Sequence, residues 1–377
     1  MNILNINSYY YSSTVHKQLQ EALLESQINS YTYVPLPKNY VAREECIYDK
    51  DEYVHVKKAE CYNGIDRYFF HIKHAKILNN ITKEINIKKY DLLHAHSLFS
   101  NGYIAMRLKQ RYGIPYIVAV RDTDINTFFE KMIHLRKLGK NILHNADAVV
   151  FLSKPYKEYL IARYIKDNEK EIIMSKSHII PNGINEFWLD NIYTPRQIES
   201  KEKIRLLHVG TVSRRKNILK TIEAIKILIE KGYNVDYTVI GKIEDKGIYQ
   251  EILKYDFVKY IAPKPYNELL KFYRENDVFV MPSITESFGL VYLEAMSQGL
   301  PVIYTKGQGF DGQFDEGTVG FSVDCFDAKD IANRIIDIID NYEMISSNCI
   351  RDVNKLRWKN IAQKYNDLYT KVLNIKY

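Results

Sequence analysis

Short apolar runs alternate with longer amphipathic stretches along most of this chain. That alternation predicts parallel strands joined by helices that cover the sheet. In the first part of the chain we expect strands at 3–6, 91–94, 116–120, 148–152 and 178–180, with helices at 15–25, 103–111 and 128–144 between them.

A second alternation begins after the turn Pro181-Asn182-Gly183 and the polar segment 189–203. Its expected strands are 204–209, 235–240, 277–281 and 301–304, and its expected helices are 218–231, 267–276 and 289–298. We therefore predict an α/β protein with a first domain at 1–190 and a second from 191 onward. Each would be a Rossmann-like, doubly wound domain, and the two would face a central cleft where ligands bind.

Composition narrows the class of protein. Apolar residues make up 46% of the chain and charged residues 26%, which excludes a mainly disordered protein. No uncharged apolar stretch is long enough to span a membrane, and Cys46, Cys61, Cys325 and Cys349 include no metal-binding pair. We therefore expect a cytoplasmic protein. The net charge of the chain is +7, and residues 1–190 carry more of this positive excess than the remaining residues do. This excess favours an anionic partner.

The segment PSITESFGLVYLEAMSQGLPVI, residues 282–303, carries the strongest candidate chemistry. A buried strand ends before it, and a helix is expected to start near Phe288, so the amides of Phe288, Gly289, Leu290 and Val291 would form an anion site. Glu286 precedes this helix and Glu294 follows eight positions later, an arrangement suited to hydroxyl groups on either side of a phosphate. The alternative is that Glu286 caps the helix and Glu294 is solvated.

A second strand, loop and helix, IRLLHVGTVSRRKNI at 204–218, places three consecutive cations after a strand. Arg214, Arg215 and Lys216 at the carboxyl end of a sheet would neutralise a diphosphate leaving group. Asn217 is expected to cap the following helix. A basic triplet in a loop is otherwise merely solvated.

These segments resemble the retaining glycosyltransferases of the GT-B fold, family 4, whose signature is two glutamates separated by seven residues. The resemblance implies that Glu286 contacts the donor sugar, that the amides after Ser287 hold the diphosphate, and that Glu294 binds the ribose. It also implies phosphate contacts from Lys216. In the family's donor-phosphate loop, which the segment 204–218 resembles, an arginine usually follows the glycine, whereas here Thr211 follows Gly210 and Arg214 or Arg215 would substitute for the arginine.

Further segments of the chain extend the resemblance. Gly241, which ends a strand in VIGKIED, would let the backbone approach the nucleotide. The segment RWKNIAQKYNDLYTKVL resembles the family's final helix, which implies that 191–355 bind the donor, 1–190 bind the acceptor and 356–377 cross back to the first domain.

The first domain offers sugar or acceptor contacts at His96, Arg121 and Asp124. His96 lies in DLLHAHSLFS, which resembles a family segment with paired histidines, although it could equally satisfy local hydrogen bonds. Arg121 stands where the family usually has a histidine, and an arginine would bind an anion or a hydroxyl instead of acting as a base. Asp122-Thr123-Asp124 spells a DxD metal motif, which we reject because the cations of the second domain already supply positive charge.

The resemblance implies a retaining glycosyltransferase that needs no metal or other cofactor. A UDP- or GDP-linked sugar would be the donor, and a glycan or lipid-linked oligosaccharide of a bacterial surface polysaccharide the acceptor. The basic segments 68–89 and 131–140 would either lie on the inner face of a membrane or form ordinary solvated helix faces. The alternatives are another enzyme on this fold, such as a phosphorylase or epimerase, and a catalytically silent binding module or partner subunit. A dehydrogenase is disfavoured because no GxGxxG motif follows the first strand. A nucleic-acid binder is disfavoured because the sequence has no known nucleic-acid-binding motif.

Overall fold

The computed structural model describes residues 1–41, 55–198 and 203–374. The chain forms two compact units. The first comprises 1–152, 156–183 and 358–377, and the second comprises 153–155 and 184–357. The division falls at Gly183, a few residues before the expected boundary at 190, because Ile184 already pairs with Arg357 of the second unit.

The first unit is built on a seven-stranded sheet in the order β3-β2-β1-β4-β5-β6-β7, and all its pairs are parallel. Its strands are β1 (Asn2–Ile6), β2 (Asn29–Pro37), β3 (Val56–Tyr62), β4 (Leu92–Ala95), β5 (Tyr116–Val120), β6 (Ala148–Phe151) and β7 (Ser177–Ile179). Strands β2 and β3 were not predicted, because β2 mixes polar residues and prolines with its apolar residues and β3 carries two consecutive lysines and a glutamate with no regular alternation.

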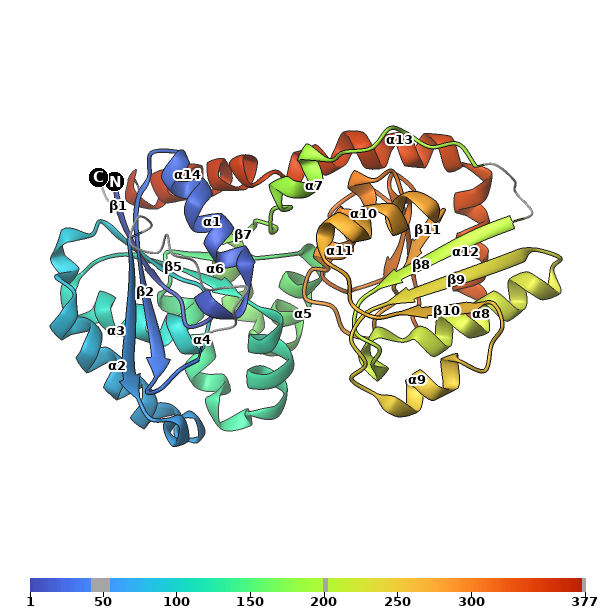
Figure 1. The fold of residues 1–377 in the computed structure, drawn as a ribbon. Coiled ribbons are helices and arrows are strands. Elements are labelled where there is room, and N and C mark those ends of the chain that lie inside the picture. The colour runs from blue at the N-terminus through green and yellow to red at the C-terminus, as the bar shows by residue number, and fades with distance from the viewer. Residues whose placement is uncertain (42–54, 199–202, 375–377) are drawn as a thin grey trace. The chain divides into compact units, whose positions relative to one another are not determined.

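Helices cover both faces of this sheet (Figure 1). The helices are α1 (Thr14–Glu25), α2 (Phe70–Glu84), α3 (Ser100–Tyr112), α4 (Arg136–Asn145), α5 (Lys154–Tyr164), α6 (Asp167–Ser175) and α14 (Trp358–Asn374). Helix α14 packs on α1, while α2, α3, α4 and α6 contact one another in sequence on the other face. The indole of Trp358 donates to Gln18 of α1 and packs on Gly183, where a Cβ would overlap the ring.

The second unit is built on a six-stranded parallel sheet in the order β10-β9-β8-β11-β12-β13. Its strands are β8 (Lys203–Val209), β9 (Asn234–Ile240), β10 (Val258–Ile261), β11 (Val278–Val280), β12 (Val302–Thr305) and β13 (Gly320–Val323). Its helices are α7 (Glu186–Asp190), α8 (Ile218–Glu230), α9 (Lys246–Ile252), α10 (Tyr266–Glu275), α11 (Leu290–Ser297), α12 (Ala328–Asp340) and α13 (Tyr342–Val353). These two sheets confirm the predicted α/β class.

The structure also describes the two features that composition brought forward, membrane-spanning helices and cysteines. Among the described residues, no helix combines the length and the hydropathy that crossing a membrane requires. Cys61, Cys325 and Cys349 carry free thiols, and Cys46 lies outside the described residues.

Candidate active site

The two candidate segments of the second unit meet at one edge of its sheet. Strands β8 and β11 are parallel neighbours, so the loops that follow them lie at the same carboxyl edge. The amide of Ile284 donates to the carbonyl oxygen of Arg215 across 2.8 Å, which ties the loops together. The sheet topology therefore brings the basic triplet beside Glu286.

A buried ion pair forms the centre of this edge. Lys216 Nζ lies 2.6 Å from Glu286 Oε2, and both residues are 8% exposed. Arg215 lies 3.6 Å from the same carboxylate oxygen and donates to the carbonyl of Thr285. Burial lowers the pKa of Lys216, and the neighbouring Glu286 carboxylate raises it. Glu286 is thus the counter-ion that favours the charged form of the Lys216 side chain at a position from which water is excluded.

In the loop before α8, Asn217 does not have the capping role that was predicted for it. Arg214, Arg215 and Lys216 form a single 3-10 turn, in which Lys216 points inward while Arg214 is exposed. Asn217 follows with a left-handed backbone (φ 57°) and does not cap α8 with its side chain. Its amide instead donates to the carbonyl oxygens of Pro282 and Cys325, which fixes the turn against the neighbouring loops.

Helix α11 starts later than predicted. It begins at Leu290, after Gly289 with a φ of 78°, so Phe288 and Gly289 precede the helix. A short helix of this kind still directs its first amides toward the carboxyl edge. Ser287 lies beneath the glycine-rich loop 307–312, where a Cβ on Gly309 would be 1.9 Å from the carbonyl oxygen of Ser287.

That glycine-rich loop was missed by the sequence analysis. Gln308 Oε1 accepts from the amide of Glu286, and the amide of Gly309 donates to the carbonyl of Glu286, both at 2.9 Å. The loop therefore sets the backbone that carries the Glu286 carboxylate. The signal was present as glycines at 307, 309 and 312, directly after a strand.

Glu294 is the fifth residue of α11 and is buried, contrary to the alternative of a solvated side chain. Its Oε2 accepts from the hydroxyl of Tyr273, on α10, at 3.0 Å. Burial raises the pKa of Glu294 to about 7, and the Tyr273 hydrogen bond offsets part of that rise. No local pattern could reveal Tyr273 as a partner, because it lies on another helix.

The raised pKa of Glu294 predicts a dependence of stability on pH. Between pH 4.5 and about 7 the folded protein keeps a proton that the unfolded chain releases, so its stability should fall as pH rises. Relative to Glu294→Gln, the wild-type free energy of unfolding should drop by roughly 3 kcal/mol over this interval. Urea unfolding at pH 5 and pH 8 measures the difference. A difference that does not change with pH would contradict the assignment.

Gly241 lies at the end of β9, beside Gly210 at the end of β8. A Cβ on Gly241 would be 1.8 Å from the carbonyl oxygen of Gly210, so no larger residue fits without moving one of the loops. The two glycines therefore permit a close approach of the two backbone segments, and the expected approach of a nucleotide to Gly241 stays a prediction.

In the first unit, His96 belongs to a buried cluster of imidazoles. Its ring stacks on His94 at 4.1 Å and meets His16 edge-on at 5.6 Å. Its Nε2 lies 3.1 Å from Asn5 Oδ1, and Tyr369 of α14 contacts His94 Nδ1 at 2.8 Å. Burial lowers the pKa of His16 and His94 to about 3 each. His94 and His96 are buried and His16 is half-buried, and the cluster packs α14 against the sheet through the contact of His94 with Tyr369.

Asp124 and Arg121 form the turn after β5. The Asp124 carboxylate is 2% exposed and accepts from the amides of Leu98, Phe99 and Arg121. Burial raises its pKa to about 6, while these hydrogen bonds lower it. Asp124 thus holds two loops together, and its contact with a sugar or acceptor stays a prediction. Arg121 is half-buried and donates through Nε to the carbonyl of His96.

Two family models match the chain. The model described as glycosyl transferases group 1 matches residues 192–351, and the model described as Glycosyltransferase Family 4 matches residues 13–186. No cluster of three or more His, Cys, Asp or Glu side chains that could hold a metal ion occurs among the residues the structure describes.

Relatives and solved structures agree with these models. An uncharacterized glycosyltransferase of Methanocaldococcus jannaschii is 27% identical over 77% of this chain and 74% of its own length. The capsular polysaccharide biosynthesis glycosyltransferase CapM of Staphylococcus aureus is 28% identical over 70% of this chain and 73% of its own. The structure of Anabaena HepE in complex with UDP and glucose superposes with a TM-score of 0.69 at 16% identity, covering 98% of this chain and 100% of that one. The chain therefore belongs to the group 1, family 4 glycosyltransferases of the GT-B fold.

Proposed function

We propose that this glycosyltransferase transfers a sugar from a UDP- or GDP-linked donor to a hydroxyl acceptor, with retention of the anomeric configuration and without a metal or other cofactor. The observation that carries the proposal is the buried Lys216–Glu286 pair, which sits with Arg215 at the carboxyl edge of β8 and β11. A charged lysine held in a dry position is suited to an anionic leaving group.

In the proposed reaction the bond between the anomeric carbon and the diphosphate oxygen breaks, and a bond from that carbon to the acceptor oxygen forms. The diphosphate leaves with the electron pair and accepts the proton that the acceptor hydroxyl loses. Lys216, with Arg215 and the exposed Arg214, would neutralise the leaving group, aided by the amides from Ser287 to Val291. This positive charge takes the place that a divalent metal has in other transferases.

The two glutamates would hold the rest of the donor. Glu286 would contact the sugar while keeping Lys216 charged, Glu294 would bind the ribose hydroxyls, and Gly241 would make room for the nucleotide. Retention is the outcome that the family resemblance implies. The UDP complex of HepE supports a uridine nucleotide, since that protein shares this fold.

The acceptor would be a glycan or a lipid-linked oligosaccharide of a surface polysaccharide, built on the cytoplasmic side of the membrane. The name of CapM, a capsular polysaccharide enzyme, supports this setting. Arg121, exposed in part after β5, is the candidate of the first unit for an anionic or hydroxyl group of that acceptor or of the sugar. His96 and Asp124 would hold Arg121 in position. The carbonyl oxygen of His96 accepts from Arg121 Nε, and the carboxylate of Asp124 accepts from the Arg121 amide.

Calorimetric titration with UDP, GDP and ADP in the absence of metal tests the donor half of this proposal. We expect one nucleotide to bind tightly to the wild type and about 10- to 100-fold more weakly to Glu294→Ala, because hydrogen bonds to a charged group are worth roughly 1.5–3 kcal/mol. Glu230→Ala, which removes an exposed glutamate at the end of α8, is the matched control and should bind like the wild type.

The same titration separates the enzyme from a silent binding module. If a folded wild-type protein binds none of the three nucleotides, the silent module becomes the better account. If binding requires added magnesium, the metal-independent mechanism is wrong.

A further inference from the structure

The Lys216 ammonium has one charged acceptor in the structure. Glu286 Oε2 accepts from Lys216 Nζ at 2.6 Å, and within the described part of the chain this is the only ion pair that Lys216 forms. The thioether of Met281 lies 3.3 Å from the same nitrogen, and a thioether is a weak acceptor. A diphosphate that binds Lys216 must therefore compete with the Glu286 carboxylate for the same charge.

The wall behind Lys216 is neutral. A Cβ on Gly210 would lie 3.3 Å from His208 Nε2 and 3.5 Å from Lys216 Cε, so both side chains pack on the glycine. Burial and the charge of Lys216 lower the pKa of His208 to about 3, so its imidazole carries no charge at neutral pH. Among the described residues, this wall offers Lys216 no second anion.

The Glu286 carboxylate is carried by an anchored backbone. The amide of Glu286 donates to Gln308 Oε1, and its carbonyl oxygen accepts from the amide of Gly309, both at 2.9 Å. Arg215 also lies 3.6 Å from Glu286 Oε2, the oxygen that accepts from Lys216. Two cations thus face one carboxylate oxygen. A diphosphate bound to both cations would bring its own oxygens close to this carboxylate, which repels them.

Transfer of the sugar changes this competition. While the sugar is attached, its hydroxyl groups can donate to Glu286, and the diphosphate has one ionisable oxygen fewer. After transfer those donors are gone, and the terminal phosphate ionises near neutral pH, because its pKa is about 6. The carboxylate then faces more negative charge and has lost the donors of the sugar.

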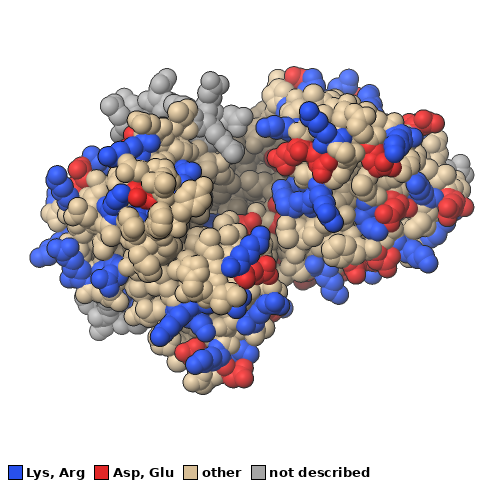
Figure 2. Space-filling view, turned by 90° about the horizontal axis from the view of Figure 1, so that it is seen from below, with Lys and Arg blue, Asp and Glu red and all other residues tan. Residues whose placement is uncertain are grey.

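The visible surface of the second unit adds no broad field of positive charge. On the side that Figure 2 presents, acidic and basic side chains of this unit lie interspersed. Such a surface attracts a free diphosphate weakly at long range. Retention of the diphosphate therefore depends on the local contacts of Lys216 and its neighbours.

We propose that Glu286 makes this site discriminate between an intact nucleotide sugar and a free nucleoside diphosphate, and thereby drives release of the product. Glu286 accepts from the sugar hydroxyls while the donor is whole. It takes Lys216 back from the diphosphate once the sugar has been transferred. This inference rests on the proposed function and adds product release to it.

Calorimetric titration of Glu286→Gln tests the inference. We expect this variant to bind UDP about 10-fold more tightly than the wild type, because it removes a charged competitor for Lys216 and keeps the shape of the side chain. The gain with UDP-glucose should be smaller, since the same change removes the charged acceptor of the sugar hydroxyls. GDP and GDP-mannose replace these probes if GDP is the nucleotide that the wild type binds.

A double-mutant cycle shows whether the gain passes through Lys216. In a Lys216→Gln background, Glu286→Gln should change UDP affinity by less than about twofold, because the ammonium for which the carboxylate competes is absent. A gain of the same size in both backgrounds would mean that Glu286 repels the diphosphate without involving Lys216, and it would overturn the inference.

Glu244→Gln is the matched control. Glu244 is exposed on the loop after β9, and its charge raises the pKa of Lys216 less than the charge of Glu286 does. Glu244→Gln removes the same unit of charge and should leave UDP affinity within about twofold of the wild type. A gain equal to that of Glu286→Gln would show a general effect of charge and count against the release role.

The result for the wild type separates the inference from the proposed function. A folded wild type that binds no nucleotide contradicts the proposed function, and this inference with it. A wild type that binds UDP, while Glu286→Gln binds it equally or more weakly, leaves the proposed donor site standing and overturns only the release role of Glu286. Unchanged circular dichroism would show that the variants fold.

Discussion

Lys216→Ala is expected to lower kcat by about 10²- to 10³-fold, because it removes a preorganised charge from the proposed leaving-group site. Lys216 Nζ is held at 2.6 Å from Glu286 in a buried position, so water cannot replace it as it could at the surface. The loss should appear in kcat as well as in kcat/KM, since charge on the diphosphate grows toward the transition state. Steady-state rates with the nucleotide sugar identified by titration measure it.

The matched control is Lys220→Ala on α8, the helix that follows the loop of Lys216. Lys220 pairs with Glu223 outside the loop, so this variant should retain the wild-type rate. Lys216→Ala at the wild-type rate, in a protein shown to be folded, would remove Lys216 from the catalytic assignment. A rise in KM alone would instead make Lys216 a binding residue, with equal contacts to substrate and transition state.

The donor edge could largely be predicted from the sequence because its information is local. Strand, loop and helix follow one another twice within short segments, and the carboxyl ends of adjacent parallel strands must meet. That reasoning places Lys216 near Glu286, and the structure has them in contact. The burial of Glu294 follows from its position on α11, whose apolar neighbours cover the sheet.

The remaining features depend on contacts between distant segments. Tyr273 reaches Glu294 from another helix, and Asn217 turns from helix capping toward Pro282 and Cys325 because its backbone is left-handed. The sequence likewise gives no sign that the Asp124 carboxylate accepts from three backbone amides of two separate loops. Periodicity and spacing carry no information about such partners.

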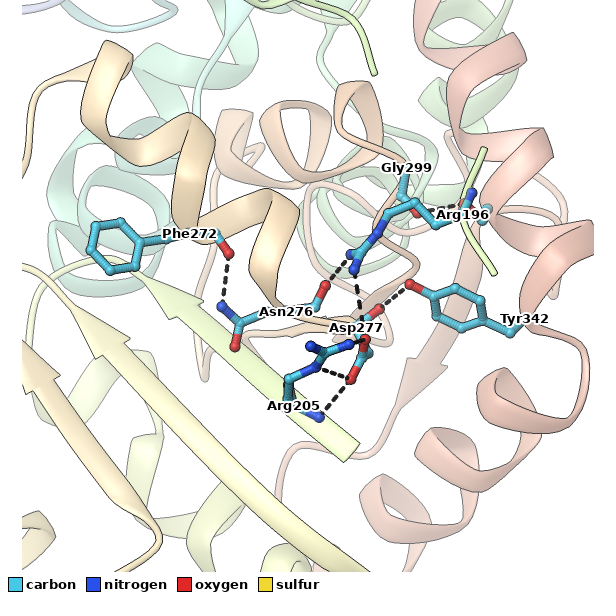
Figure 3. A network of polar contacts seen from close by, with 8 residues as sticks. Arg196, Arg205, Phe272, Asn276, Asp277, Gly299 and Tyr342 are labelled. Carbon is cyan, nitrogen blue, oxygen red and sulfur yellow. Dashed lines mark hydrogen bonds and ion pairs between the residues drawn. The ribbon is translucent and has the colours of Figure 1, made fainter. Parts of the chain in front are cut away.

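Asp277→Ala is expected to lower the free energy of unfolding of the second unit by about 3–5 kcal/mol. Asp277 directly precedes β11, its side chain is 1% exposed, and its two oxygens accept from the Arg205 guanidinium at 2.9 and 3.0 Å (Figure 3). Arg196 lies 3.7 Å from the same carboxylate and also contacts the carbonyl of Asn276. Removing the carboxylate takes a buried acceptor from both guanidinium groups, and the side chain of Arg196 is itself largely buried. Urea unfolding followed by tryptophan fluorescence measures the loss.

The chain has two tryptophans, so Trp358→Phe leaves Trp188, buried in the second unit, as the reporter of that unit alone. In this background Asp337→Ala is the matched control. It breaks an ion pair with Arg334 in which both side chains are more than 40% exposed, and it should change stability by less than about 1 kcal/mol. Because Asp277 anchors the strand that leads to Glu286, the buried variant should also weaken nucleotide binding. Equal stability of the two variants would mean that solvent reaches the Arg205–Asp277 pair and that burial does not fix the start of β11.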